Sequence, residues 1–158
     1  MKNRFVIFML GALIACSSSI PIHATESSVY LVGNMSVEHL LNQYPAFKSQ
    51  YENYQVDDRV DLSGILDMDI VIMFGVWCHG SEREVPRMLR ILEEVGLSSQ
   101  QISLIGVDIR KQEPKGREKI FNLKSTPTFI FFLKGEEVGR IIESPVSSLE
   151  TDLHKMTL

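Results

Sequence analysis

Long apolar runs separated by polar stretches dominate the second half of the chain. Residues 70–74, 102–107 and 128–133 are nearly continuous runs of branched and aromatic side chains. Such runs are typical of strands that are covered on both faces of a sheet. Residues 137–142 instead have an amphipathic pattern, and a Lys-Gly-Glu turn at 134–136 connects them to the preceding run. This pattern predicts three buried strands and a fourth, amphipathic strand that returns beside them.

Helical spacing of apolar residues appears between and after these runs. The strongest pattern covers residues 82–95, and Gly96 suits the C-terminal cap of that helix. Weaker patterns predict helices over residues 115–123 and 147–156. The order strand, helix, strand, helix, strand, strand, helix predicts an α/β fold whose mixed central sheet has helices on both faces.

The region before the first apolar run has a weaker pattern. Apolar residues at helical spacing predict a helix over residues 37–51, with Ser36 as its N-cap. A short strand is predicted over residues 54–56. Turn residues at 57–58 and 63–64 predict breaks in regular structure.

The first residues have the pattern of a targeting signal. Two basic residues precede an apolar stretch, residues 5–15, that is too short to span a bilayer as a helix. The segment Leu13-Ile14-Ala15-Cys16 resembles the lipobox of bacterial lipoproteins, in which Cys16 would be lipidated. The alternative is cleavage by signal peptidase after Ala24. Both alternatives predict export to the periplasm or cell envelope of a bacterium, and both remove Cys16 as a free thiol partner.

Composition and charge narrow the function classes. With 44% hydrophobic and 23% charged residues, the chain has enough apolar residues for one core. The formal net charge is −4 and no continuous basic run is present, which argues against nucleic acid as a partner. Two cysteines are too few for a disulfide scaffold.

Cys78 lies at the junction between a predicted buried strand and a predicted helix. The unpaired N–H groups and the dipole at a helix N-terminus favour the thiolate, which is the reactive form of cysteine. This position predicts a nucleophilic thiol. The alternative is an inert, buried cysteine that acts as a small apolar residue.

Four features occur in order in the second half of the chain: Trp77-Cys78 after a buried strand, Pro86 eight residues later, Val107-Asp108 at a strand end, and Ser125-Thr126-Pro127-Thr128 before an apolar strand. Together they resemble the thioredoxin family. The resemblance covers about residues 69–158 and implies a thioredoxin-like three-layer sandwich in a domain over 67–158. The preceding parts are then a signal over 1–24 and a linker with an N-terminal elaboration over 25–66.

The resemblance also implies roles for individual residues. The peptide bond before Pro127 would be cis, and Pro127 would face Cys78. Thr126 would offer backbone hydrogen bonds to an extended substrate segment. Trp77 would flank the thiol and shape the docking surface.

Two positions depart from the family pattern. Ser81 stands where thioredoxins have the second, resolving cysteine, and Ile72 stands where many have a buried carboxylate. Their joint loss indicates a monothiol Cys-x-x-Ser site that forms a mixed disulfide and needs an external thiol to release it.

Two neighbours of the thiol, His79 and Ser81, leave alternatives open. His79 either stabilises the thiolate when protonated or is an exposed residue at the helix start. Ser81 either donates a hydrogen bond to the sulfur or serves as an N-cap or first-turn residue, and the two roles are compatible. Residues 82–84 are predicted to form a solvated first turn.

The sequence therefore predicts thiol–disulfide exchange through Cys78, with thiol- or disulfide-containing proteins as clients and an external thiol as reductant. The alternative is a non-catalytic thioredoxin-like binding or chaperone module of the cell envelope, and a weaker third prediction is a redox sensor. No ligand spacing of a zinc site is visible in the sequence. We therefore predict neither a metal nor a cofactor.

Overall fold

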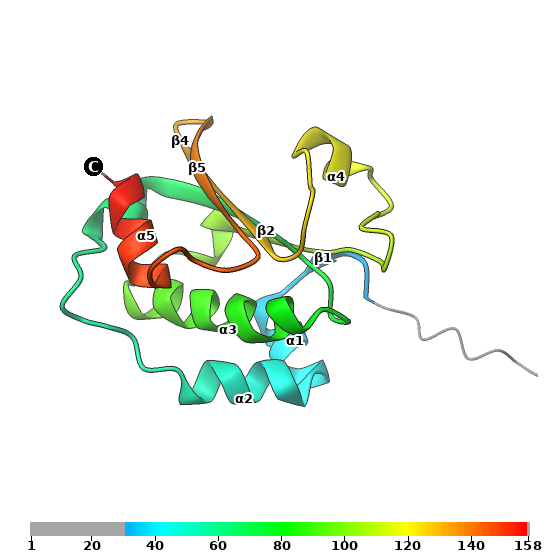
Figure 1. The fold of residues 1–158 in the computed structure, drawn as a ribbon, viewed down its shortest axis with the longest axis horizontal. Helices are drawn as coiled ribbons and strands as arrows, with labels where there is room; N and C mark the ends of the chain where they lie inside the picture. The colour runs from blue at the N-terminus through cyan, green and yellow to red at the C-terminus, as the bar shows by residue number, and fades with distance from the viewer. Residues whose placement is uncertain (1–30, 158) are drawn as a thin grey trace, which may run out of the picture.

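A five-stranded mixed sheet organises the molecule (Figure 1). The computed structural model describes residues 31–157, in which the strands follow the order β1-β3-β2-β4-β5. β2 and β3 are parallel, whereas the other neighbouring pairs are antiparallel. The predicted signal, both cleavage sites and Cys16 lie outside the described residues. The strands are β1 (Gly33–Met35), β2 (Met68–Phe74), β3 (Ile102–Gly106), β4 (Thr128–Leu133) and β5 (Glu136–Ile142).

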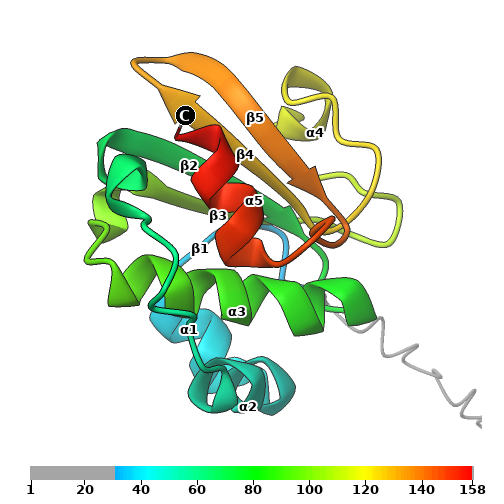
Figure 2. The same cartoon turned by 60° about the vertical axis from the view of Figure 1, so that its left-hand side comes forward.

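Helices lie on both faces of this sheet, as the sequence predicts. Figure 2 shows α3 and α5 on one side of the sheet and α4 on the other, with α2 outside α3. The helices are α1 (Val37–Gln43), α2 (Pro45–Asn53), α3 (His79–Glu94), α4 (Arg117–Ile120) and α5 (Leu149–Met156). Two short 3₁₀ helices, η1 (Ser63–Asp67) and η2 (Ser99–Gln101), precede β2 and β3.

β2 is the central strand, and its side chains alternate between two apolar clusters. Ile70, Ile72 and Phe74 belong to the larger cluster beneath α3 and α5. Val71 and Met73 belong to the smaller cluster on the opposite face. The predicted strand covered on both faces is confirmed. β3, β4 and β5 also match their predicted ranges to within one residue.

The helix predicted over residues 37–51 is wrong, because the chain forms two helices there. Pro45 has no N–H to donate and disfavours helical backbone at the preceding residue. Tyr44 accordingly has φ −123° and ψ 93° and separates α1 from α2. The predicted N-cap is confirmed, since the Ser36 hydroxyl accepts a hydrogen bond from the His39 N–H at 3.1 Å.

The strand predicted over residues 54–56 is also wrong, because this segment is irregular. The sheet edge beside β3 is taken by β1, a three-residue strand that the pattern does not predict. Tyr54 and Val56 instead pack against the larger core cluster. Residues 63–64 begin η1 rather than a simple turn, and the helix predicted over 115–123 shortens to α4.

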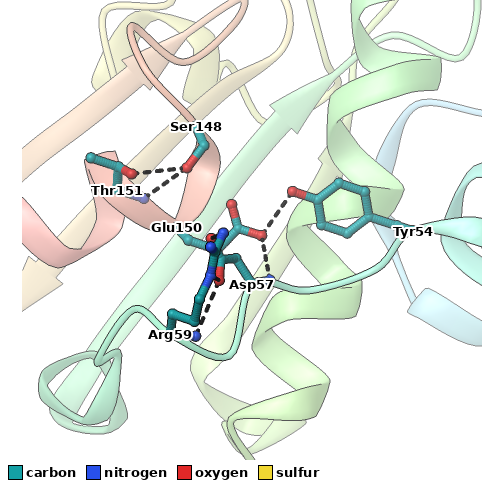
Figure 3. A network of polar contacts seen from close by, with 6 residues as sticks. All are labelled: Tyr54, Asp57, Arg59, Ser148, Glu150 and Thr151. Atoms are coloured by element: carbon teal, nitrogen blue, oxygen red, sulfur yellow. Dashed lines mark hydrogen bonds and ion pairs between the residues drawn. The ribbon is translucent and has the colours of Figure 1, made fainter.

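A buried carboxylate fastens the irregular segment to α5 (Figure 3). Glu150 is almost fully buried, and its Oε1 accepts hydrogen bonds from the Tyr54 hydroxyl at 2.8 Å and from the Asp57 N–H at 3.3 Å. Burial, together with the bond to Glu150, raises the pKa of Tyr54 well above its ordinary value. The tyrosine therefore remains a hydrogen-bond donor throughout the neutral range.

Replacing Tyr54 by Phe leaves the Glu150 carboxylate buried with one hydrogen bond fewer. We expect Tyr54→Phe to lower the free energy of unfolding by about 1.5–3 kcal/mol, the usual contribution of a hydrogen bond to a charged group. Chemical denaturation measures this change. Tyr44→Phe is the matched control, because within residues 31–157 the Tyr44 hydroxyl has no hydrogen-bond partner. Equal losses in the two variants would contradict the role given to the Tyr54–Glu150 bond.

Candidate functional site

Four loops meet at one edge of the sheet. β2 and β3 are parallel, so their carboxyl ends lie at the same edge. β4 is antiparallel to β2, so its first residues lie there too, and β5 ends beside them. This topology brings together residues 75–78, 107–112, 124–127 and 143–148, which are far apart in the sequence.

Cys78 is the N-cap residue of α3. Its carbonyl accepts the first helical hydrogen bond, from the Glu82 N–H at 2.9 Å, and its own N–H donates to the Gly75 carbonyl at 3.0 Å. The thiol is half-buried, and its Sγ lies 3.2 Å from the Thr126 carbonyl oxygen, to which it donates. The predicted strand–helix junction is therefore where Cys78 lies, although α3 begins at His79 rather than at residue 82.

The Thr126–Pro127 peptide bond is cis, as the resemblance implies. The Pro127 carbonyl accepts a hydrogen bond from the Glu143 N–H at 2.7 Å, which attaches this loop to the end of β5. Gly80 lies beneath it, and a Cβ at this position would lie 3.4 Å from Pro127 Cδ and 3.7 Å from the sulfur of Cys78. The loop and the first turn of α3 thus enclose the sulfur from two sides.

Trp77 is held against the neighbouring loop. Its Nε1 donates to the Val107 carbonyl at 3.0 Å, which links the residue before the thiol to the end of β3. The ring passes directly over Gly75, where any Cβ would lie only 2.4 Å from the indole. Gly75 is therefore required for the Trp77 position, a requirement that sequence reasoning missed.

The sulfur opens onto a groove of about 300 Å³. Its lining residues come from α3, the cis-proline loop and the end of β5: Cys78, Gly80, Arg83, Thr126, Glu143 and Ser144. A larger pocket of about 420 Å³ lies between α3 and the irregular segment after α2, but it contains no thiol. The groove beside Cys78 is thus the candidate site.

No protein-family model matches the sequence, and comparison with curated proteins gives no match. Solved structures do resemble the chain. A structure described as that of a malarial protein has 25% identity and a TM-score of 0.43, and the alignment covers 58% of this chain and 97% of that one. Reduced thioredoxin pre-protein of Schistosoma mansoni has 22% identity, a TM-score of 0.44, and coverage of 57% and 79%. Plasmodium falciparum thioredoxin has 22% identity, a TM-score of 0.42, and coverage of 56% and 81%.

The sheet order, the cysteine that caps α3 and the loop of Thr126 and Pro127 beside it agree with what the resemblance implies. The chain has a thioredoxin-like fold. Ile72, at the position of the family's buried carboxylate, is fully buried in the thioredoxin-like core. Within residues 31–157, Cys78 is the only cysteine.

Several polar groups set the pKa of the Cys78 thiol. Burial of Cys78 raises its pKa, but hydrogen bonds from the Thr126 side chain, the Ser81 N–H and hydroxyl and the Gly80 N–H outweigh it. The net result is a pKa below the ordinary value of a cysteine. Thr126 acts in both directions, because its carbonyl accepts from the protonated thiol. These groups favour the nucleophilic form over the inert alternative.

Ser81 combines two of the predicted roles. It lies in the first turn of α3, fully buried, and its hydroxyl accepts from the Gly75 N–H at 3.3 Å. Its hydrogen bonds also lower the pKa of Cys78. The N-cap alternative is wrong, since the cap is Cys78 itself.

His79 and the following turn differ in their exposure. His79 is exposed at the helix start and is not among the groups that lower the pKa of Cys78. The solvated first turn predicted over residues 82–84 is wrong for Glu84, which is only 4% exposed. Glu84 lies on the same helix face as the buried Met88 and Ile91, and it accepts a hydrogen bond from the Arg83 Nε.

Sequence reasoning also missed the charged lining of the groove. Arg83 lines it from α3 and Glu143 from the end of β5, and Glu143 has φ +65° in the left-handed region. A non-glycine residue is uncommon in that region. No local motif identifies these residues, because their place depends on the loops that meet at the sheet edge.

Two wider searches concern only the described residues. Residues 31–157 contain no group of three or more histidine, cysteine or acidic side chains placed to hold a metal ion. None of the helices in the same range has the length and apolar character needed to cross a membrane.

The pH dependence of alkylation tests the state of the thiol. We expect the midpoint for Cys78 to lie below the pKa of about 8.5 of free cysteine, because hydrogen bonds stabilise its thiolate. Ser81→Ala removes the hydroxyl and should move the midpoint to higher pH. Ser103→Ala, at an exposed serine of β3, is the control and should leave it unchanged. Mass spectrometry of the alkylated protein follows the reaction, and a wild-type midpoint at or above that of free cysteine would contradict this expectation.

Proposed function

We propose that this protein is an exported thiol–disulfide exchange protein that acts through Cys78 alone. The observation that carries the proposal is the half-buried thiol with a lowered pKa, which opens onto a groove beside Thr126 and Pro127. A thiolate is the species that attacks disulfides. The thioredoxin-like fold supports this chemistry without specifying the single-cysteine mechanism.

The exchange has three steps. The Cys78 thiolate attacks one sulfur of a client disulfide, a new S–S bond forms to Cys78, and the other client sulfur leaves as a thiolate. An external thiolate then attacks the Cys78 sulfur of this mixed disulfide, and the second client sulfur leaves as a thiolate. A second external thiolate attacks the external sulfur now bonded to Cys78, and the electron pair of the broken S–S bond returns to Cys78. Two external thiols are thereby oxidised to one disulfide and the client disulfide is reduced to two thiols, while Cys78 is unchanged after the cycle.

The external thiol is needed because Ser81 occupies the position of a resolving cysteine. A hydroxyl stabilises the thiolate by a hydrogen bond but does not attack the mixed disulfide. The buried Ile72 also supplies no carboxylate to accept or donate a proton. Both residues favour a mixed disulfide that persists until a second thiol arrives.

The second candidate function is a non-catalytic binding or chaperone module of the cell envelope. It is favoured by the charged groove residues Arg83 and Glu143, which provide contacts for a client without any covalent step. Retention of client binding after Cys78→Ser would select this function. Loss of binding and turnover together would select exchange.

Export and partners belong to the same proposal. The N-terminal pattern supports secretion, with either a lipid anchor at Cys16 or cleavage after Ala24. Proteins with accessible thiols or disulfides are the proposed clients, and a small or protein thiol is the proposed reductant. Cys16→Ala, followed by separation of membrane and soluble fractions, distinguishes the two alternatives. A lipid anchor at Cys16 predicts that the variant leaves the membrane fraction, whereas cleavage after Ala24 predicts no change.

The first prediction concerns turnover of a peptide disulfide with dithiothreitol as the external thiol. We expect the wild-type chain to accelerate reduction and to accumulate as a mixed disulfide when dithiothreitol is omitted. Cys78→Ser should abolish both, because serine is not a thiolate. Mass spectrometry detects the adduct, and acceleration that survives in Cys78→Ser would contradict the proposal.

The substitution Ser81→Cys introduces a cysteine at the position of the missing resolving thiol. Ser81 is buried one helical turn from the thiol, and it lowers the pKa of Cys78. We expect Ser81→Cys to form a reducible intramolecular disulfide with Cys78 and to release the client without an added thiol. Mass spectrometry and single-turnover client release measure this gain. Persistence of the client adduct in Ser81→Cys would contradict the role assigned to Ser81.

A further inference from the structure

A basic groove of about 430 Å³ lies on the segment that connects β3 to β4 and includes α4. Residues 110–124 contain six of the sixteen Lys and Arg residues of the chain but only two acidic ones. The chain as a whole has a net charge of −4, so this local excess of positive charge opposes the overall charge. The groove is lined by Arg110, Lys111, Gln112, Glu118, Lys119, Asn122, Leu123 and Lys124.

Most of the positive charge in the groove is available to a ligand. Within residues 31–157, no carboxylate lies within ion-pair distance of Lys111, Lys119 or Lys124. Arg110 is only loosely paired, with its Nε 3.6 Å from Asp108. The one acidic lining residue, Glu118, accepts a hydrogen bond from the Glu113 N–H at 3.3 Å. A negatively charged ligand would therefore meet mainly uncompensated cations.

The groove is built on a well-anchored loop. Glu113 is buried and accepts hydrogen bonds from the Arg117 guanidinium at 3.0 and 2.9 Å, and these bonds hold the pKa of Glu113 at about 2. Asp108 accepts from the N–H groups of Arg110 and Gln112, each at 2.8 Å. These contacts fix the backbone of the loop that carries the cations, which reduces the entropy lost on binding.

The same loop is joined to the reactive site at both ends. At its beginning, the Val107 carbonyl accepts from Trp77, the residue before Cys78. At its end, Lys124 lies two residues before Thr126, whose carbonyl contacts the sulfur. Ile109, 63% exposed, is an apolar residue of the same loop. Both ends of the loop that carries the groove therefore lie beside residues that contact the thiol site.

We propose that this basic groove binds an acidic segment of the protein client that reacts at Cys78. The proposal rests on the proposed exchange function and adds the chemical class of its client. Its concave shape, and the attachment of its loop to the thiol site at both ends, favour an extended chain rich in Asp and Glu over a flat anionic membrane. Opposite charges mainly accelerate the encounter, and salt weakens them.

The test compares two peptides, each with one cysteine activated as a 2-pyridyl disulfide. One peptide carries Asp and Glu around the cysteine, and the other carries Asn and Gln. We expect Cys78 to react about tenfold faster with the acidic peptide at low salt, and the preference to fall below about threefold at 0.5 M salt. Release of 2-thiopyridone measures the second-order rate.

The decisive variant combines Lys111→Gln, Lys119→Gln and Lys124→Gln. It should lose the preference for the acidic peptide while its rate with the neutral peptide remains unchanged. The matched control removes three exposed lysines elsewhere, with Lys48→Gln, Lys134→Gln and Lys155→Gln, and should keep the preference. Equal loss in both variants, or no preference in the wild type, would overturn the proposal.

A binding measurement separates this proposal from the exchange function. Fluorescence anisotropy follows the acidic peptide with its cysteine replaced by serine, added to the Cys78→Ser chain. If Cys78 reacts with neither activated peptide but this binding is present and lost in the lysine variant, the exchange function fails and the groove still binds acidic chains. If the acidic peptide does not bind, the groove proposal is overturned. It is also overturned if a parallel sedimentation assay shows that the chain binds phosphatidylglycerol vesicles but not the peptide.

Discussion

The burial of β2 on both faces is the constraint on which the other features depend. Its alternating side chains fill two apolar clusters of different composition, so a shift by one residue would move the side chains of each cluster to the opposite face of the sheet. Its parallel partner β3 and antiparallel partner β4 then bring three loops to its carboxyl end. The thiol, the cis-proline loop and the basic groove are neighbours because this strand fixes where each of their loops begins.

How much the sequence predicts depends on whether local information decides the outcome. β2 and β4 follow from continuous apolar runs, and Cys78 follows from its place between a strand and a helix. β1 has three residues and no pattern, so only its pairing with β3 reveals it. Glu84 has a charged side chain that predicts exposure, yet the packing of α3 buries it. Arg83 and Glu143, which line the groove beside Cys78, were missed for the same reason, since segments from different elements bring them together.

Opposing effects meet at the sulfur. Half-burial disfavours the thiolate, whereas the helix N–H groups and two side chains favour it, and the second effect is larger. Ser81 belongs to both the fold and the site, because its hydroxyl accepts from Gly75 and also stabilises Cys78. A serine at this position therefore preserves the start of α3 and the stabilisation of the thiolate, but it supplies no second thiol to resolve a mixed disulfide within the chain. This explains how a thiol site remains ordered and polarised without a resolving cysteine.

In the proposed exchange function, the basic groove adds a selection of clients by charge that a single thiol lacks. A monothiol site discriminates poorly between clients if only the sulfur is recognised, because any accessible disulfide offers the same two atoms. The lysines of the 110–124 excursion sit at the same sheet edge as Cys78, on a loop held by the buried Glu113–Arg117 pair. Their field raises the local concentration of acidic segments before any covalent bond forms. Since the rest of the chain is net acidic, it disfavours the approach of such segments elsewhere. In the proposed function, recognition by charge and reaction at sulfur occur at one edge of the sheet but use different residues.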